Sequence, residues 1–154
     1  MADIFEFTLS LDLRDELSEA DVAELRWHLG LGDLPESGLR IESGSRWLIE
    51  NDEGHLVELD PQPLLDQRGP ACETGGILTA SLERTPTGWR LEARQEVHPE
   101  VFPEMSALMR WLYLRVDFGM VQPDGSVELG RLRGYEDEHS QPLLVRDDRV
   151  FWPR

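Results

Sequence analysis

Four polar side chains on one face of an N-terminal strand are the residues best placed to bind a small molecule. Residues 5–13 alternate apolar and polar types without a break, which predicts a strand with one face in the core. On the other face two carboxylates flank two hydroxyls, a set that could hold a polar or cationic ligand inside an enclosed cleft. These ligand-binding candidates are Glu6, Thr8, Ser10 and Asp12. The alternative, which we favour, is a sheet face in contact with water, as antiparallel sheets commonly have.

A run of carboxylates that ends in an imidazole is the best metal-like cluster in the chain. It extends from Glu136 to His139, and these residue types suit a divalent ion. The run lies between Gly134 and Pro142, which indicates a loop, and no second copy accompanies it. Charge runs of this kind are usually solvated. We therefore predict no metal site and no cofactor.

Nucleophilic and phosphate chemistry find little support in the sequence. Cys72 is the one thiol, but the neighbouring Glu73 disfavours a thiolate and no histidine lies nearby, which favours a structural cysteine. The tripeptide 117–119 (Asp-Phe-Gly) matches a kinase motif, yet the chain has no lysine and no glycine-rich phosphate loop. We interpret it as the end of a helix at Gly119. No catalytic motif is found, so we lean towards a non-catalytic protein.

The charge of the chain is strongly negative. It has 31 acids, 15 arginines and a net charge of −16. Residues 1–60 contain 16 acids and 4 arginines, a net charge of −12, and residues 61–154 carry the remaining −4. This field repels nucleic acids and anionic lipids and attracts basic proteins. With one cysteine and no long apolar run, we expect a cytoplasmic protein without a membrane partner.

Local patterns predict the remaining elements. Ser18, followed by acids, is an N-cap, and Leu25 and Leu29 lie on the apolar side of the helix that it begins. A second helix is predicted over residues 101–116. Turn residues and alternation predict a short strand over 39–42, hairpins over 47–59, 78–97 and 143–152, and a strand over 126–133.

The second predicted helix is apolar around most of its girth. Such a helix is covered on more than one side, so it either lies centrally in the domain or packs one flank against a second subunit. Aromatic residues dominate the energetics of protein interfaces. The candidate interface residues are Trp111 and Leu114 on this helix, together with Trp47 and Trp152 near hairpin edges.

These observations predict a single α+β domain over residues 1–154: a twisted antiparallel sheet built from hairpins, with both helices on its apolar face. A ferredoxin-like core with additions is the first topology we expect, and two such half-units that share a sheet are the alternative. The favoured function is a non-catalytic protein-interaction or regulatory domain that binds a basic partner or forms a homodimer. The alternative is a small-molecule-binding protein or enzyme with a pocket between the sheet and the second helix.

Overall fold

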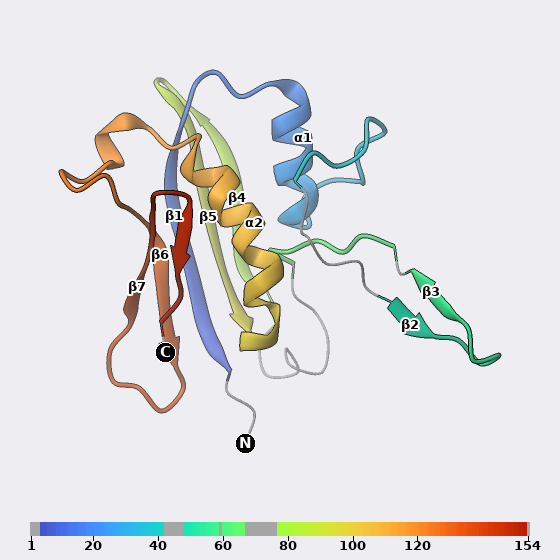
Figure 1. Cartoon of the computed structure of the whole chain (residues 1–154). Coiled ribbons are helices and arrows are strands. Elements are labelled where there is room, and N and C mark those ends of the chain that lie inside the picture. Colours follow the sequence, from blue (N-terminus) through green and yellow to red (C-terminus); the bar gives the residue numbers. More distant parts are fainter. Residues whose placement is uncertain (1–3, 42–47, 59, 67–76, 154) are drawn as a thin grey trace.

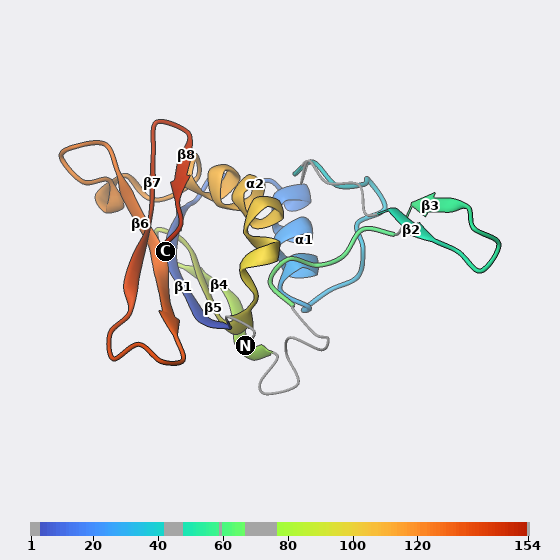
Figure 2. The same cartoon turned by 60° about the horizontal axis from the view of Figure 1, so that its bottom comes forward.

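The computed structural model describes residues 4–41, 48–58, 60–66 and 77–153, and these form an α+β fold. Two α-helices cover one face of a six-stranded antiparallel sheet (Figure 1). A separate two-stranded sheet projects from the side of these layers (Figures 1 and 2). The predicted fold class is therefore confirmed. None of the described helices is long and apolar enough to cross a membrane.

The large sheet has the strand order β4-β5-β1-β6-β7-β8, and every neighbouring pair is antiparallel. The central strand β1 pairs over its whole length with β5 and over its first half with β6. In chain order the strands are β1 (Phe5–Arg14), β4 (Ile77–Thr85), β5 (Gly88–Val97), β6 (Val127–Gly134), β7 (Gln141–Arg146) and β8 (Arg149–Phe151).

Two helical connections organise the middle of this sheet. Helix α1 lies between β1 and β4 in the chain, and α2 lies between β5 and β6. Each connected pair of strands is separated by one other strand in the sheet order. This is the order that a ferredoxin-like βαββαβ core would have. That the chain shares such a fold remains a prediction.

Helix α1 (Glu19–His28) begins and ends where the local sequence predicts. The Ser18 hydroxyl accepts the N–H of Asp21 at 3.1 Å, and the Asp21 carboxylate accepts the N–H of Ser18 at 3.3 Å. These two bonds form a capping box, which satisfies N–H groups that the first turn leaves unpaired. At the other end Gly30 adopts φ +72°, and Leu31 donates its N–H to the carbonyl of Arg26.

Helix α2 (Phe102–Tyr113) follows a 3-10 turn over Pro99–Val101 and lies across the sheet. Its side towards the sheet is fully buried through Met105, Leu108, Met109 and Leu112. One flank is covered by the C-terminal segment, where the rings of Phe102 and Trp152 stack with their centroids 4.2 Å apart. Contacts within the chain therefore account for much of the apolar girth, in agreement with the central location.

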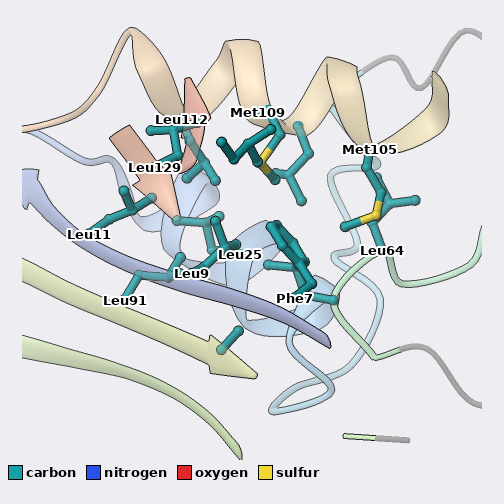
Figure 3. Packing of buried hydrophobic residues seen from close by; sticks show 14 of the residues in the cluster. Phe7, Leu9, Leu11, Leu25, Leu64, Leu91, Met105, Met109, Leu112 and Leu129 are labelled. Atoms are coloured by element: carbon teal, nitrogen blue, oxygen red, sulfur yellow. The ribbon is translucent and has the colours of Figure 1, made fainter. Parts of the chain in front are cut away.

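The core lies between the sheet and the two helices. Alternate residues of β1 point into it, and α1, α2 and the neighbouring strands close it from the other sides (Figure 3). Burying this many aliphatic side chains supplies the main driving force for folding. The labelled members in Figure 3 are Phe7, Leu9, Leu11, Leu25, Leu64, Leu91, Met105, Met109, Leu112 and Leu129.

Two local predictions are wrong. Residues 39–41 form no strand, because the carboxylate of Glu24 accepts the backbone N–H groups of Arg40 and Ile41 that a ladder would have used; residue 42 lies outside the described residues. The second helix does not continue to Gly119. After Tyr113 the chain turns back to the sheet, and residues 118–120 form a 3-10 turn capped by Asp117.

Candidate functional site

The four predicted ligand-binding residues form a row on the face of β1 that points away from the helices. The carboxylate oxygen Oε2 of Glu6 lies 2.9 Å from Nη2 of Arg94 on β5 and 3.7 Å from Nη2 of Arg133 on β6. Two guanidinium groups therefore neutralise this carboxylate. A cationic ligand would have to replace one of them.

The other acid of the row is also paired. Nη1 of Arg90 lies 3.1 Å from Oδ1 of Asp12, while Nη2 donates to the hydroxyl of Ser10 at 2.6 Å and to Glu92 at 3.1 Å. The hydrogen bond to Asp12 is the main cause that raises the pKa of Arg90 above its usual value. The structure thus brings Ser10 and Asp12 together around one arginine, as parts of an ion-paired sheet surface.

A shallow hollow lies beside Thr8 and Ser10 on this outer face. Its volume is about 390 Å³, and β6 together with the preceding loop supplies the rest of its lining: Met120, Gln122, Glu128, Gly130 and Arg131. Arg131 already contacts Glu128 at 2.6 Å. Helix α2 lies on the opposite face of the sheet, so it does not enclose the row. Ligand binding by these residues remains a prediction.

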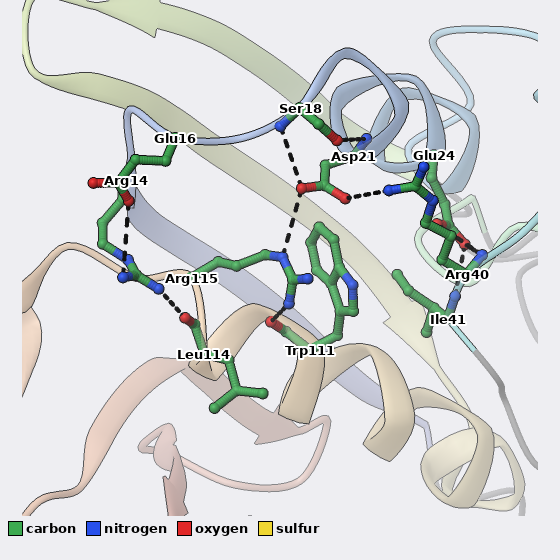
Figure 4. Close-up of polar contacts among 10 residues, drawn as sticks. All are labelled: Arg14, Glu16, Ser18, Asp21, Glu24, Arg40, Ile41, Trp111, Leu114 and Arg115. Atoms are coloured by element: carbon green, nitrogen blue, oxygen red, sulfur yellow. Dashed lines mark hydrogen bonds and ion pairs between the residues drawn. The ribbon is translucent and has the colours of Figure 1, made fainter.

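The interface candidates at the end of α2 lie in a polar junction between both helices (Figure 4). The guanidinium of Arg115 lies 3.7 Å above the ring of Trp111 and 3.8 Å from the carboxylate of Asp21. Leu114 is 59% exposed, and its carbonyl accepts a hydrogen bond from Arg14. These contacts border a cavity of about 340 Å³. The arginines that line it have carboxylate or carbonyl partners, so the junction needs no ligand to balance its charges.

The structure describes one of the other two tryptophan candidates. Trp152 packs in the fold: its indole N–H donates to the hydroxyl of Ser106 at 2.8 Å, in addition to the stacking on Phe102. Trp47 lies outside the described residues. A role of either residue in an interface remains a prediction.

No group of metal-binding side chains is found among the described residues. Residues 136–139 are exposed in the turn between β6 and β7, where Asp137 accepts the N–H of Gly134 at 3.2 Å. This places the predicted acidic loop at the surface. Cys72 lies outside the described residues.

In the hairpin of β2 (Leu48–Glu50) and β3 (Leu56–Glu58), none of the strand residues is buried. Its large apolar side chains are open to solvent: Leu48 is 56%, Ile49 45%, Leu56 70% and Val57 37% exposed. In Figures 1 and 2 the hairpin extends away from both layers. Exposed apolar residues concentrated on one small element indicate an interaction surface.

The turn of this hairpin is specified locally. The side-chain oxygen of Asn51 accepts the N–H groups of Glu53 at 3.0 Å and His55 at 2.9 Å, and Gly54 adopts φ +80°. Asn and Gly suit such turns because the amide caps backbone donors and glycine tolerates positive φ. The turn is therefore specified by residues of the hairpin itself.

Buried polar groups of α1 hold the chain on both sides of the hairpin. Before it, the 1% exposed carboxylate of Glu24 accepts the N–H groups of Arg40 at 2.9 Å and Ile41 at 3.0 Å. After it, Nδ1 of His28 accepts the N–H of Leu64 at 3.2 Å. Two buried side chains one helical turn apart thus fix both ends of the projecting segment.

Sequence reasoning predicted this hairpin but not the exposure of its apolar side chains. The signal was the adjacent pair Leu48 and Ile49, which places apolar side chains on both faces of one strand. A strand of this type is either covered on both sides or open on both sides. The acids that follow the pair, Glu50, Asp52 and Glu53, favour the open case.

Comparison with known proteins adds no family to this picture: no family model matches the chain, and no curated protein or solved structure matches it significantly.

Proposed function

We propose that this protein is a non-catalytic protein-interaction domain and that the β2–β3 hairpin is its binding element. The observation that carries the proposal is the exposure of four large apolar side chains on a projecting hairpin in which no residue is buried. Burial of such side chains against a partner is favourable by about 25 cal/mol per Å² of apolar surface. The other two candidate surfaces, the outer face of β1 and the junction at the end of α2, are in contrast occupied by ion pairs.

The partner is a basic protein. Residues 48–60 contain five acids and no arginine: Glu50, Asp52, Glu53, Glu58 and Asp60. A negative element attracts a positive surface over long distances and increases the association rate. The same charge disfavours nucleic acid and a second copy of the chain, which carries −16 itself. A homodimer through Trp111 and Leu114 is the less favoured assembly.

Site-specific photo-crosslinking tests this proposal. A photoreactive amino acid replaces Val57 on the hairpin, and a matched variant carries it at Thr87, an exposed turn residue between β4 and β5. We expect one basic protein from the source cells to crosslink at position 57 and not at position 87. Binding of that purified protein should weaken as salt is added. Absence of a position-dependent crosslink would contradict the proposal.

The hollow beside Thr8 and Ser10 supports a second candidate, the binding of a small polar molecule. Hydroxyls and an ion pair on its rim are groups that orient a ligand by hydrogen bonds. A ligand that raises the melting temperature should lose this effect in Thr8→Val, which removes the hydroxyl and keeps the side-chain shape. An unchanged shift in that variant would exclude the hollow as the binding site.

A further inference from the structure

We propose that the partner contributes an extended segment with alternating basic and aliphatic residues, which adds as a third strand to an open edge of the β2–β3 hairpin. This inference rests on the proposed function, since it takes the hairpin as the binding element. It specifies the mode of binding and the chemistry of the bound segment.

Among the residues that the structure describes, no strand covers either edge of the hairpin. Within the described residues β2 and β3 pair with each other and belong to no larger sheet. Asn51 donates its N–H to the carbonyl of His55 at 2.8 Å. Because hydrogen-bonded and non-hydrogen-bonded pairs alternate along an antiparallel ladder, the backbone groups of the next pair, Glu50 and Leu56, point outwards. These groups are available to an added strand.

The two faces of the hairpin favour different types of side chain in the added strand. Ile49 lies opposite Val57, which makes one face aliphatic. On the other face Glu50 lies opposite Leu56, so an acid is present beside an apolar residue. Side chains of an added strand alternate between the two faces. An aliphatic residue therefore packs beside the Ile49–Val57 pair, and the next residue meets Glu50, where a basic side chain fits.

Charge selects this occupant over a second copy of the chain. If two copies of the chain paired through this edge, each hairpin would bring a net charge of −5 over residues 48–60 next to the same charge on the other. Like charges directly opposite each other destabilise paired strands, whereas opposite charges stabilise them. A two-stranded hairpin is also marginally stable alone in water, so a third strand stabilises the hairpin as it binds. Strand addition of this kind is an established mode of peptide recognition.

Two synthetic peptides of equal composition test the proposal with the full-length protein. In one, arginine and valine alternate over about eight residues, a usual strand length; in the other, the arginines and valines form separate blocks. We expect the alternating peptide to bind at least about tenfold more tightly, which is about 1.4 kcal/mol. Equal affinities would show that charge alone attracts the peptide, and would overturn strand addition.

Nuclear magnetic resonance on the unsubstituted protein gives a second readout that does not depend on a folded variant. With the alternating peptide bound, the outward N–H of Glu50 or Leu56 should exchange with solvent at least about tenfold more slowly. Unchanged exchange at both amides would overturn the proposal. The crosslinking experiment is independent of these peptides, so a partner that crosslinks at Val57 would preserve the proposed function even if strand addition fails.

Discussion

The imidazole of His28, at the end of α1, accepts the backbone N–H of Leu64 at 3.2 Å, although the two residues are 36 positions apart. The other ring nitrogen, Nε2, is buried and has no hydrogen-bond partner in the described part of the chain. Burial lowers the pKa of His28 to about 4. The ring is therefore neutral in the folded protein at pH 7, as its role as an acceptor requires.

This relationship predicts that stability falls as the solution is acidified from pH 6.5 to pH 4. The unfolded chain binds a proton at His28 near pH 6.5, whereas the folded chain does so near pH 4. The contribution of His28 to the free energy of unfolding is therefore complete above pH 6.5. It declines as the pH falls from there to 4, by ~3 kcal/mol in total. Urea denaturation at a series of pH values measures this change.

The matched variants are His28→Gln, which retains an acceptor but cannot be protonated, and His139→Gln at an exposed position. The first should reduce the slope of stability against pH in this range, and the second should leave it unchanged. Equal slopes in the two variants would show that His28 does not control the acid sensitivity.

Glu24→Gln should destabilise the protein by about 1–3 kcal/mol, because an amide nitrogen would replace one carboxylate oxygen and face the N–H of Arg40, which that oxygen now accepts. Glu36→Gln, at an exposed loop position, should change the free energy of unfolding by less than about 0.5 kcal/mol. Denaturant titration of both variants distinguishes them. Two equally small effects would show that the hydrogen bonds from Arg40 and Ile41 to Glu24 do not stabilise the fold.

The β7–β8 turn should be stabilised by the double substitution Asp147→Asn and Asp148→Gly. Both aspartates adopt positive φ, 51° and 60°. An Asn-Gly pair fits such a two-residue turn with less backbone strain. We expect a gain of about 0.5–1 kcal/mol, measured as a higher melting temperature. A lower melting temperature would show that the aspartate side chains stabilise the turn.

Asp12→Asn should cost less than about 1 kcal/mol, since exposed ion pairs contribute little. Arg90 keeps its contacts with Ser10 and Glu92 in this variant. Thermal denaturation at low and high salt provides the measurement. A loss of several kcal/mol would mean that the outer face of the sheet has a structural role beyond its ion pairs.

Local signals predicted the parts of the fold that depend on nearby residues. The alternation over residues 5–13 fixes β1 because each side chain of a strand takes the opposite face from the last. Ser18 and Asp21 fix the start of α1 because the two partners of the capping box are only three positions apart. These features require no knowledge of distant parts of the chain.

Long-range contacts determined the features that sequence reasoning could not predict. Arg40 and Ile41 are kept out of a strand by Glu24, a residue 16 or 17 positions earlier. Pairing of Arg90 with Asp12 depends on the register between β5 and β1. The 70% exposure of Leu56 depends on how the hairpin lies relative to the distant helices and the large sheet, which its own sequence does not fix.

Hydrogen–deuterium exchange with the crosslinked partner present, resolved by residue, tests the central claim most directly. If the hairpin is the binding element, the amides of residues 48–58 gain protection while those lining the hollow beside Thr8 and those around Leu114 keep their exchange rates. Protection at either of these two surfaces, with no change in the hairpin, would contradict the account.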